Sequence, residues 1–74
     1  MNRKDFSHRI ADMNERVFDI ENELESIKLK IIMEDNPERK EWFNNAQDRL
    51  RQKKDEMDRE IQEFTSENFS SLED

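Results

Sequence analysis

The sequence predicts an all-α fold: an antiparallel hairpin of two long helices that is coiled-coil-like and dimerises into a four-helix bundle. Two observations carry this prediction. Apolar residues recur at alternating spacings of four and three through the first half of the chain, a pattern that a coiled coil uses and a β-strand cannot produce. An Asn36-Pro37 pair then interrupts the helical pattern.

The first helix is predicted for residues 3–34. Asn2 or Asp5 is suited to cap its start. Acid-before-base pairs such as Asp5–Arg9, four residues apart, add about 0.3 kcal/mol each. The residues expected to face the second helix form an unbroken seam: Phe6, Ile10, Met13, Val17, Ile20, Leu24, Ile27 and Ile31.

The break between the helices is predicted at residues 34–36. Proline lacks an N–H and clashes with the preceding turn, which disfavours one continuous helix by about 3 kcal/mol. Asparagine is a preferred N-cap and proline a preferred first helical residue, so Asn36 is predicted to cap a helix that starts at Pro37. Such a short connection favours antiparallel neighbours. The alternative is a single rod kinked at Pro37.

The second helix is predicted for residues 37–66 and is less regular. A fold about residue 36 places Phe64 near Phe6. Lys53 and Lys54 are expected to interrupt the apolar seam and to face the middle of the first helix. The residues expected to point inward are Phe43, Ala46, Leu50, Met57, Ile61 and Phe64.

Residues 67–74 are expected to form a flexible, acidic C-terminal tail. Serine and threonine near position 66 compete with the helix backbone for hydrogen bonds, so the helix is expected to fray there. Phe69 and Leu72 give this tail a candidate anchor that orders in a partner's groove. The alternative is a disordered end with no partner.

The composition argues against an enzyme. The chain has no glycine, no cysteine and one histidine, which removes phosphate-binding glycine loops, thiolate catalysis and cysteine-ligated zinc. No apolar run approaches the length of a membrane span and no signal peptide follows Met1. We therefore expect a cytoplasmic protein with no membrane association and no cofactor.

Several apolar residues lie outside the seam and predict self-association. A two-helix unit of this size has too small a core to be stable alone, and a two-fold dimer would cover the additional apolar side chains. The alternative is that these residues widen the core face of a monomeric hairpin. The predicted interface consists of Ala11, Phe18, Leu29, Ile32, Met33 and Trp42.

The charge is polarised along the chain. Residues 1–54 contain twelve basic and twelve acidic residues, so the net charge of −7 belongs to residues 55–74. This acidic segment allows a DNA-mimic inhibitor as one alternative function. The basic run before it allows another, the binding of an anionic ligand such as a nucleotide or nucleic acid. The candidate anion-binding residues are Arg49, Arg51, Lys53 and Lys54.

Two groups of potential metal ligands are interpreted as ordinary surface residues. Asp5 and His8 have a spacing that suits one metal ion, but bundle metal sites draw ligands from several helices and the chain has no second histidine. The acids at the turn lack the glycine and the alternating ligands of a calcium-binding loop. These turn acids are Glu34, Asp35, Glu38 and Glu41.

The function expected from these features is that of a non-enzymatic protein–protein interaction module. It is a small adaptor, inhibitor or structural subunit, of a kind that phages and bacteria encode. The expected partners are other copies of the chain, as a homodimer or higher oligomer, and a further protein, with nucleic acid not expected among them.

Overall fold

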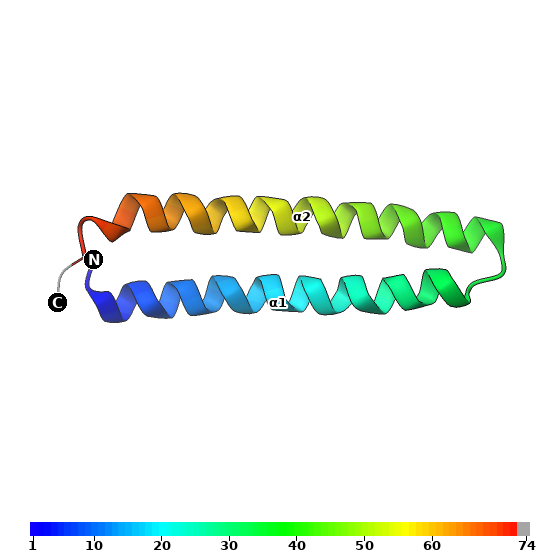
Figure 1. Cartoon of the computed structure of the whole chain (residues 1–74), viewed down its shortest axis with the longest axis horizontal. Coiled ribbons are helices and arrows are strands. Elements are labelled where there is room, and N and C mark those ends of the chain that lie inside the picture. Colours follow the sequence, from blue (N-terminus) through cyan, green and yellow to red (C-terminus); the bar gives the residue numbers. More distant parts are fainter. Residues whose placement is uncertain (73–74) are drawn as a thin grey trace.

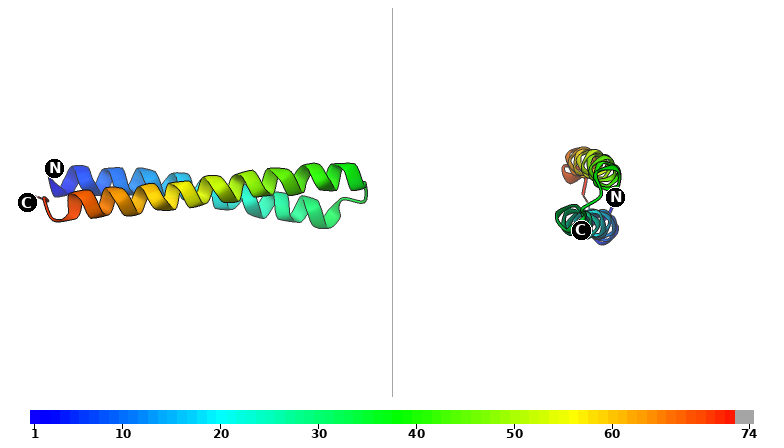
Figure 2. Two further views of the ribbon diagram at one scale, coloured as in Figure 1. Left: turned by 90° about the horizontal axis from the view of Figure 1, so that it is seen from above. Right: turned by 90° about the vertical axis from the view of Figure 1, so that its right-hand side faces the viewer.

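The chain folds as a hairpin of two long α-helices, which a computed structural model describes for residues 1–72. Helix α1 is Arg3–Met33 and helix α2 is Pro37–Phe69. The helices lie antiparallel and side by side (Figure 1), and they cross at a shallow angle (Figure 2). The molecule measures 56 × 16 × 10 Å along its principal axes. The predicted all-α hairpin is confirmed.

Asparagine caps the start of both helices. The Asn2 side-chain oxygen accepts a hydrogen bond from the Asp5 N–H at 2.8 Å, and the Asn36 side-chain oxygen accepts one from the Glu38 N–H at 2.9 Å. Each bond satisfies a backbone donor that the first helical turn leaves without a partner. The predicted cap at Asn36 is therefore confirmed, with Pro37 as the first residue of α2.

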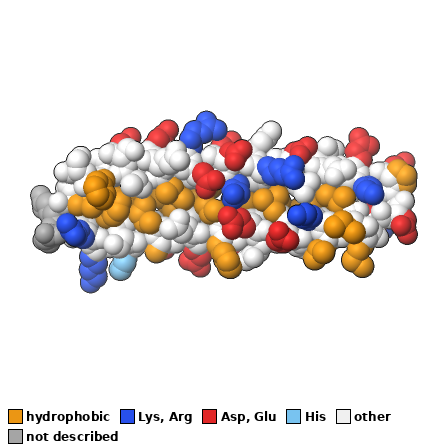
Figure 3. Space-filling view, viewed as in Figure 1, with side chains coloured by type: hydrophobic (Ala, Val, Ile, Leu, Met, Phe, Trp, Pro, Cys, Tyr) orange, Lys and Arg blue, Asp and Glu red, His pale blue; other side chains and the backbone are white. Residues whose placement is uncertain are grey.

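Apolar side chains of both helices meet along one line (Figure 3). Every residue predicted for the α1 seam is buried or half-buried, and every residue predicted to point inward from α2 is half-buried. At the terminal end, Phe64 lies beside Phe6 as predicted, and the two rings stack with their centroids 5.5 Å apart. The Arg9 guanidinium lies 6.0 Å from the centre of the Phe64 ring, where the ring's π-electrons attract a cation.

The α2 side of this contact is more regular than the sequence indicated. Gln47, Lys54 and Asn68 are half-buried and lie at seam spacings between the apolar residues. Lys53 is exposed. The expectation that both Lys53 and Lys54 interrupt the seam is therefore wrong for Lys53, because a helix places adjacent residues about 100° apart and only one can face α1.

Helix α2 also continues past Ser66 and ends at Phe69. In its last turn the Asn68 side-chain amide donates a hydrogen bond to the Phe64 carbonyl at 2.8 Å. The expected tail of residues 67–74 therefore begins within the helix. Residues 73–74 of that tail lie outside the described residues.

Two helices cover only one stripe of each other, so the core is thin. Within residues 1–72, Ile20 is the only buried apolar side chain, at 7% exposed. The chain exposes 6088 Å² of surface. A compact monomer of its mass, 9.1 kDa, exposes about 4,900 Å². The hairpin thus leaves an excess of about 1,200 Å² accessible.

Replacing Ile20 by alanine tests the importance of this thin core. We expect Ile20→Ala to lower the free energy of unfolding by about 2–3 kcal/mol, because it removes buried methyl groups and leaves a gap between the helices. The exposed neighbour Asn22 provides the control, and Asn22→Ala should change stability by about 0.5 kcal/mol or less. Urea unfolding followed by circular dichroism measures both. Equal effects would contradict the assignment of stability to the seam.

Candidate interaction surface

Large apolar side chains outside the seam remain accessible to solvent. Five residues of the predicted interface are 59% to 79% exposed, and they are Phe18, Leu29, Ile32, Met33 and Trp42. The sixth, Ala11, is also exposed. Neither helix of the hairpin covers these side chains, so they are accessible to a partner. Their use as an interface stays a prediction.

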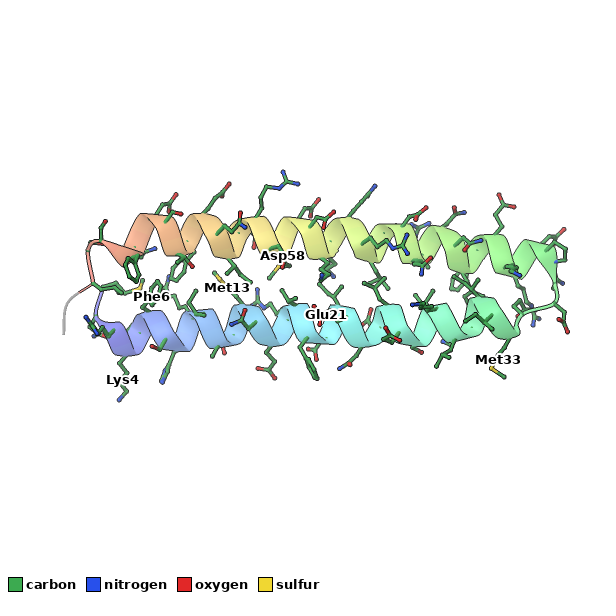
Figure 4. The ribbon with its side chains drawn as sticks, viewed as in Figure 1. Lys4, Phe6, Met13, Glu21, Met33 and Asp58 are labelled. Carbon is green, nitrogen blue, oxygen red and sulfur yellow. The ribbon has the colours of Figure 1, made fainter. Side chains whose placement is uncertain are left out.

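The α1 residues of this set lie on the side of the helix that faces away from α2. Phe18 and Ile32 are each one residue after a seam position, and Leu29 is opposite the seam. These positions lie about 130° to 170° around the helix from the centre of the seam. Figure 4 shows Met33 pointing away from α2, whereas Phe6 and Met13 point towards it.

Four exposed residues belong to the turn end of the hairpin, and we call them the turn-end cluster: Leu29, Ile32, Met33 and Trp42. There the hydrophobic surface spreads from the line between the helices onto the outer side of α1 (Figure 3). The Trp42 ring packs edge-on against Phe43, with the centroids 5.2 Å apart and the planes at 72°. Trp42 is thereby held in place beside the seam, which limits the side-chain entropy that a partner's binding would remove.

An open groove of about 440 Å³ lies within this end of the molecule. It is lined by Ser26, Leu29, Lys30, Met33, Glu34 and Phe43. Phe43 was predicted only as a core residue, and Lys30 and Glu34, which form the charged edge of the groove, were not predicted. Their spacing of four residues was the available signal, because residues four apart share a face of a helix.

Phe18 and Ala11 do not join the turn-end cluster. Phe18 lies about 21 Å along α1 from Ile32 at 1.5 Å per residue, and Ala11 lies further still. Glu25 occupies the equivalent position between Phe18 and Ile32. The predicted interface is therefore a group of residues at the turn end with a separate outlier at Phe18, rather than an even stripe along α1.

The predicted basic run is divided by the helical geometry. Arg49, Arg51 and Lys53 are exposed. The Lys54 amine instead lies 3.7 Å from a Glu21 carboxylate oxygen and 4.0 Å from an Asp58 carboxylate oxygen. Lys54 is thus held between the helices by two acids, whereas Arg49 and Lys53 share one side of α2 and Arg51 lies on the opposite side.

The predicted tail anchor is partly packed against the hairpin itself. Phe69 is exposed, whereas Leu72 is half-buried. Both line an open groove of about 370 Å³ together with Arg3, Phe6 and Ser7 from the start of α1. Phe69 and Leu72 therefore contribute to a surface at the terminal end of the hairpin, and their role as an anchor for a partner stays a prediction.

The candidate metal ligands do not come together in the described part of the chain. Residues 1–72 contain no group of three or more His, Cys, Asp or Glu side chains placed to hold a metal ion. The turn acids have local roles instead. The Glu34 carboxylate accepts a hydrogen bond from the Asn36 N–H at 3.1 Å, and Glu38 lies in the positively polarised first turn of α2.

Comparisons with known proteins leave this surface as the main guide to function. No family model, curated protein or solved structure matches the chain. Neither of the two described helices has a segment that is long and apolar enough to cross a membrane.

Replacing Lys54 by methionine tests how much its ion pairs contribute. The Lys54 side chain is 34% exposed and its two partners are about half exposed, so we expect the ion pairs to stabilise the fold only weakly. Lys54→Met would extend the apolar seam of α2 and raise the free energy of unfolding by about 1 kcal/mol.

The neighbouring variant Lys53→Met is the control, because Lys53 is exposed. Its effect on stability should stay within about 0.5 kcal/mol. Thermal unfolding of both variants measures the difference. A larger loss of stability in Lys54→Met than in Lys53→Met would contradict the expectation that the ion pairs are weak.

Proposed function

We propose that the chain is a non-enzymatic protein-interaction module that binds helices of other proteins, and of further copies of itself, through the turn-end cluster. The observation that carries the proposal is the joint exposure of Leu29, Ile32, Met33 and Trp42 at one end of the hairpin. Contiguous exposed apolar patches on small proteins mark binding surfaces.

The accessible area supports the same proposal. A standard protein interface takes about 800 Å² from each partner. The excess surface of the hairpin over a compact monomer, about 1,200 Å², is larger than this. One interface of ordinary size would therefore bring the exposed surface close to that of a compact protein.

The groove beside the turn-end cluster suits an amphipathic helix. Leu29, Met33 and Phe43 provide an apolar floor for an inserted side chain. Lys30 and Glu34 provide one charge of each sign at its edge, which would fix the orientation of a polar partner group. Trp42 stands beside the groove on Phe43, and tryptophan is among the residues that contribute most to binding energy at interfaces.

The anion-binding alternative has less support from the geometry. Lys54 is engaged by Glu21 and Asp58. Of the three cations that remain exposed, Arg49 and Lys53 share one side of α2 and Arg51 lies on the opposite side. Anion sites gain affinity from cations that converge on one place. We therefore propose no nucleic acid or nucleotide as the main ligand.

A capture experiment with matched variants tests the proposal. The purified chain is immobilised, and proteins from an extract of its source cells are identified by mass spectrometry. We expect Leu29→Glu/Ile32→Glu to reduce recovery of the partner at least about tenfold, because charges on an apolar interface remain unpaired there. Both side chains are exposed, so the variant should keep its helicity.

The control is Arg49→Glu/Lys53→Glu, which also introduces two acids at exposed positions of a helix. It should leave recovery of the partner unchanged, and added salt should have little effect. The opposite result, in which the basic-run variant and salt abolish binding while the turn-end variant does not, would replace this proposal with anion binding.

A further inference from the structure

We infer that the second copy of the chain binds antiparallel, with the two turn halves overlapping and the two acidic terminal ends pointing in opposite directions. This inference rests on the proposed function and names one partner and its orientation. It follows from where the apolar surface lies, from how charge is distributed along the hairpin, and from the symmetry of a dimer.

The apolar surface is concentrated in the half of the molecule near the turn. All four residues of the turn-end cluster fall between residues 29 and 42, and Phe18 lies at the inner limit of this half. At the other end, Met1 and Phe69 are the exposed large apolar residues within the described chain. Any arrangement in which the turn halves overlap therefore brings together most of the exposed large apolar side chains of the two copies.

The charge separates the same two halves. In the turn half, residues 18–54 contain eight basic and nine acidic residues, a net charge of −1. In the terminal half, residues 1–17 contain four basic and three acidic residues, and residues 55–72 contain one basic and six acidic residues, a net charge of −4. Repulsion between two copies thus arises mainly at the terminal ends.

Orientation decides how strong that repulsion is. In a parallel dimer the two terminal halves would lie side by side. In an antiparallel dimer centred on the midpoint between Phe18 and Ile32, residues near position 8 of the two copies are about 50 Å apart at 1.5 Å per residue. The Debye length in physiological salt is about 8 Å, so at this distance the repulsion is fully screened.

Two-fold symmetry fits the spacing of the apolar residues on α1. Phe18 and Ile32 occupy equivalent helical positions on either side of Glu25. Rotation about an axis close to Glu25 sets Phe18 of each copy against Ile32 of the other, and both apolar contacts form twice. The same axis brings the two Glu25 side chains together, so Glu25→Gln should tighten the dimer several-fold by removing this repulsion.

Distances between spin labels test the orientation. The chain has no cysteine, so Gln52→Cys and Ser66→Cys each provide one labelling site. Both positions are exposed, and they share the outer side of α2, away from the proposed interface. Within an antiparallel dimer, the Ser66 labels should be farther apart along the molecule than the Gln52 labels by about 42 Å, which is twice their separation along α2.

Three outcomes of the distance measurement would overturn the inference. Equal distances for the two label pairs would show a parallel dimer, a longer distance for the Gln52 pair would place the terminal ends in the overlap, and the absence of coupling in both would show a monomer. Ile32→Glu should abolish the coupling, whereas Gln62→Glu, which adds the same charge to an exposed site on α2, should keep it. Coupling that survives Ile32→Glu would also overturn the inference.

The same variants separate this inference from the proposed function. A chain that is monomeric by light scattering and still captures a partner through Leu29 and Ile32 would remove the antiparallel dimer and leave the interaction module intact. Antiparallel coupling without capture of another protein would support the dimer and limit the proposed function to self-association. Failure of both measurements would remove both.

Discussion

A helix that packs against a single other helix can hide only one stripe of its surface, and this constraint governs the molecule. The seam of α1 is apolar at every position, yet Ile20 alone among the described apolar side chains is buried. In a larger protein, third and fourth helices would cover the sides of the seam. In this chain those sides stay open, so the stability of the fold and the availability of its surface have the same origin.

The turn determines where the open surface is apolar. Helix α1 ends at Met33, directly after Ile32, and Asn36 caps the start of α2 at Pro37. Trp42 and Phe43 follow within the first two turns of α2 and pack against each other. A short, well-capped connection thereby brings side chains from two helices to one end of the hairpin, where they are accessible while the hairpin stays closed.

Most of the fold could be predicted from the residues because its periodicity is so regular. The spacing of the α1 seam, the Asn36-Pro37 break and the pairing of Phe6 with Phe64 all follow from local rules. The α2 seam was harder, because Gln47, Lys54 and Asn68 are half-buried although polar residues carry no hydrophobic signal. The end of α2 was also predicted too early, at Ser66, because serine and threonine there suggest fraying. The helix continues to Phe69, and the Asn68 side chain donates a hydrogen bond to the Phe64 carbonyl in its last turn.

The sequence predicted which residues belong to the candidate surface but not how they are arranged along the hairpin. The six apolar residues predicted for the interface are visible in the sequence, and the structure leaves all six exposed. Whether they form one surface depends on distance along the rod, and this separates Phe18 from the residues near the turn. The basic run illustrates the same limit, because neighbours in sequence such as Lys53 and Lys54 point in different directions from a helix.

The seam of α1 is more apolar than the seam of α2, and this difference affects what holds the hairpin closed. Helix α1 offers an apolar residue at every seam position, whereas α2 offers polar residues at Gln47, Lys54 and Asn68. If side chains alone decided the pairing, α1 would therefore pack more favourably against a second α1 helix than against α2. The connection of residues 34–36 reverses this preference, since a short tether gives α2 a local concentration in the millimolar range around α1. The hairpin is thus maintained by covalent proximity as much as by complementarity, and an intact connection is what keeps α1 from exchanging its partner.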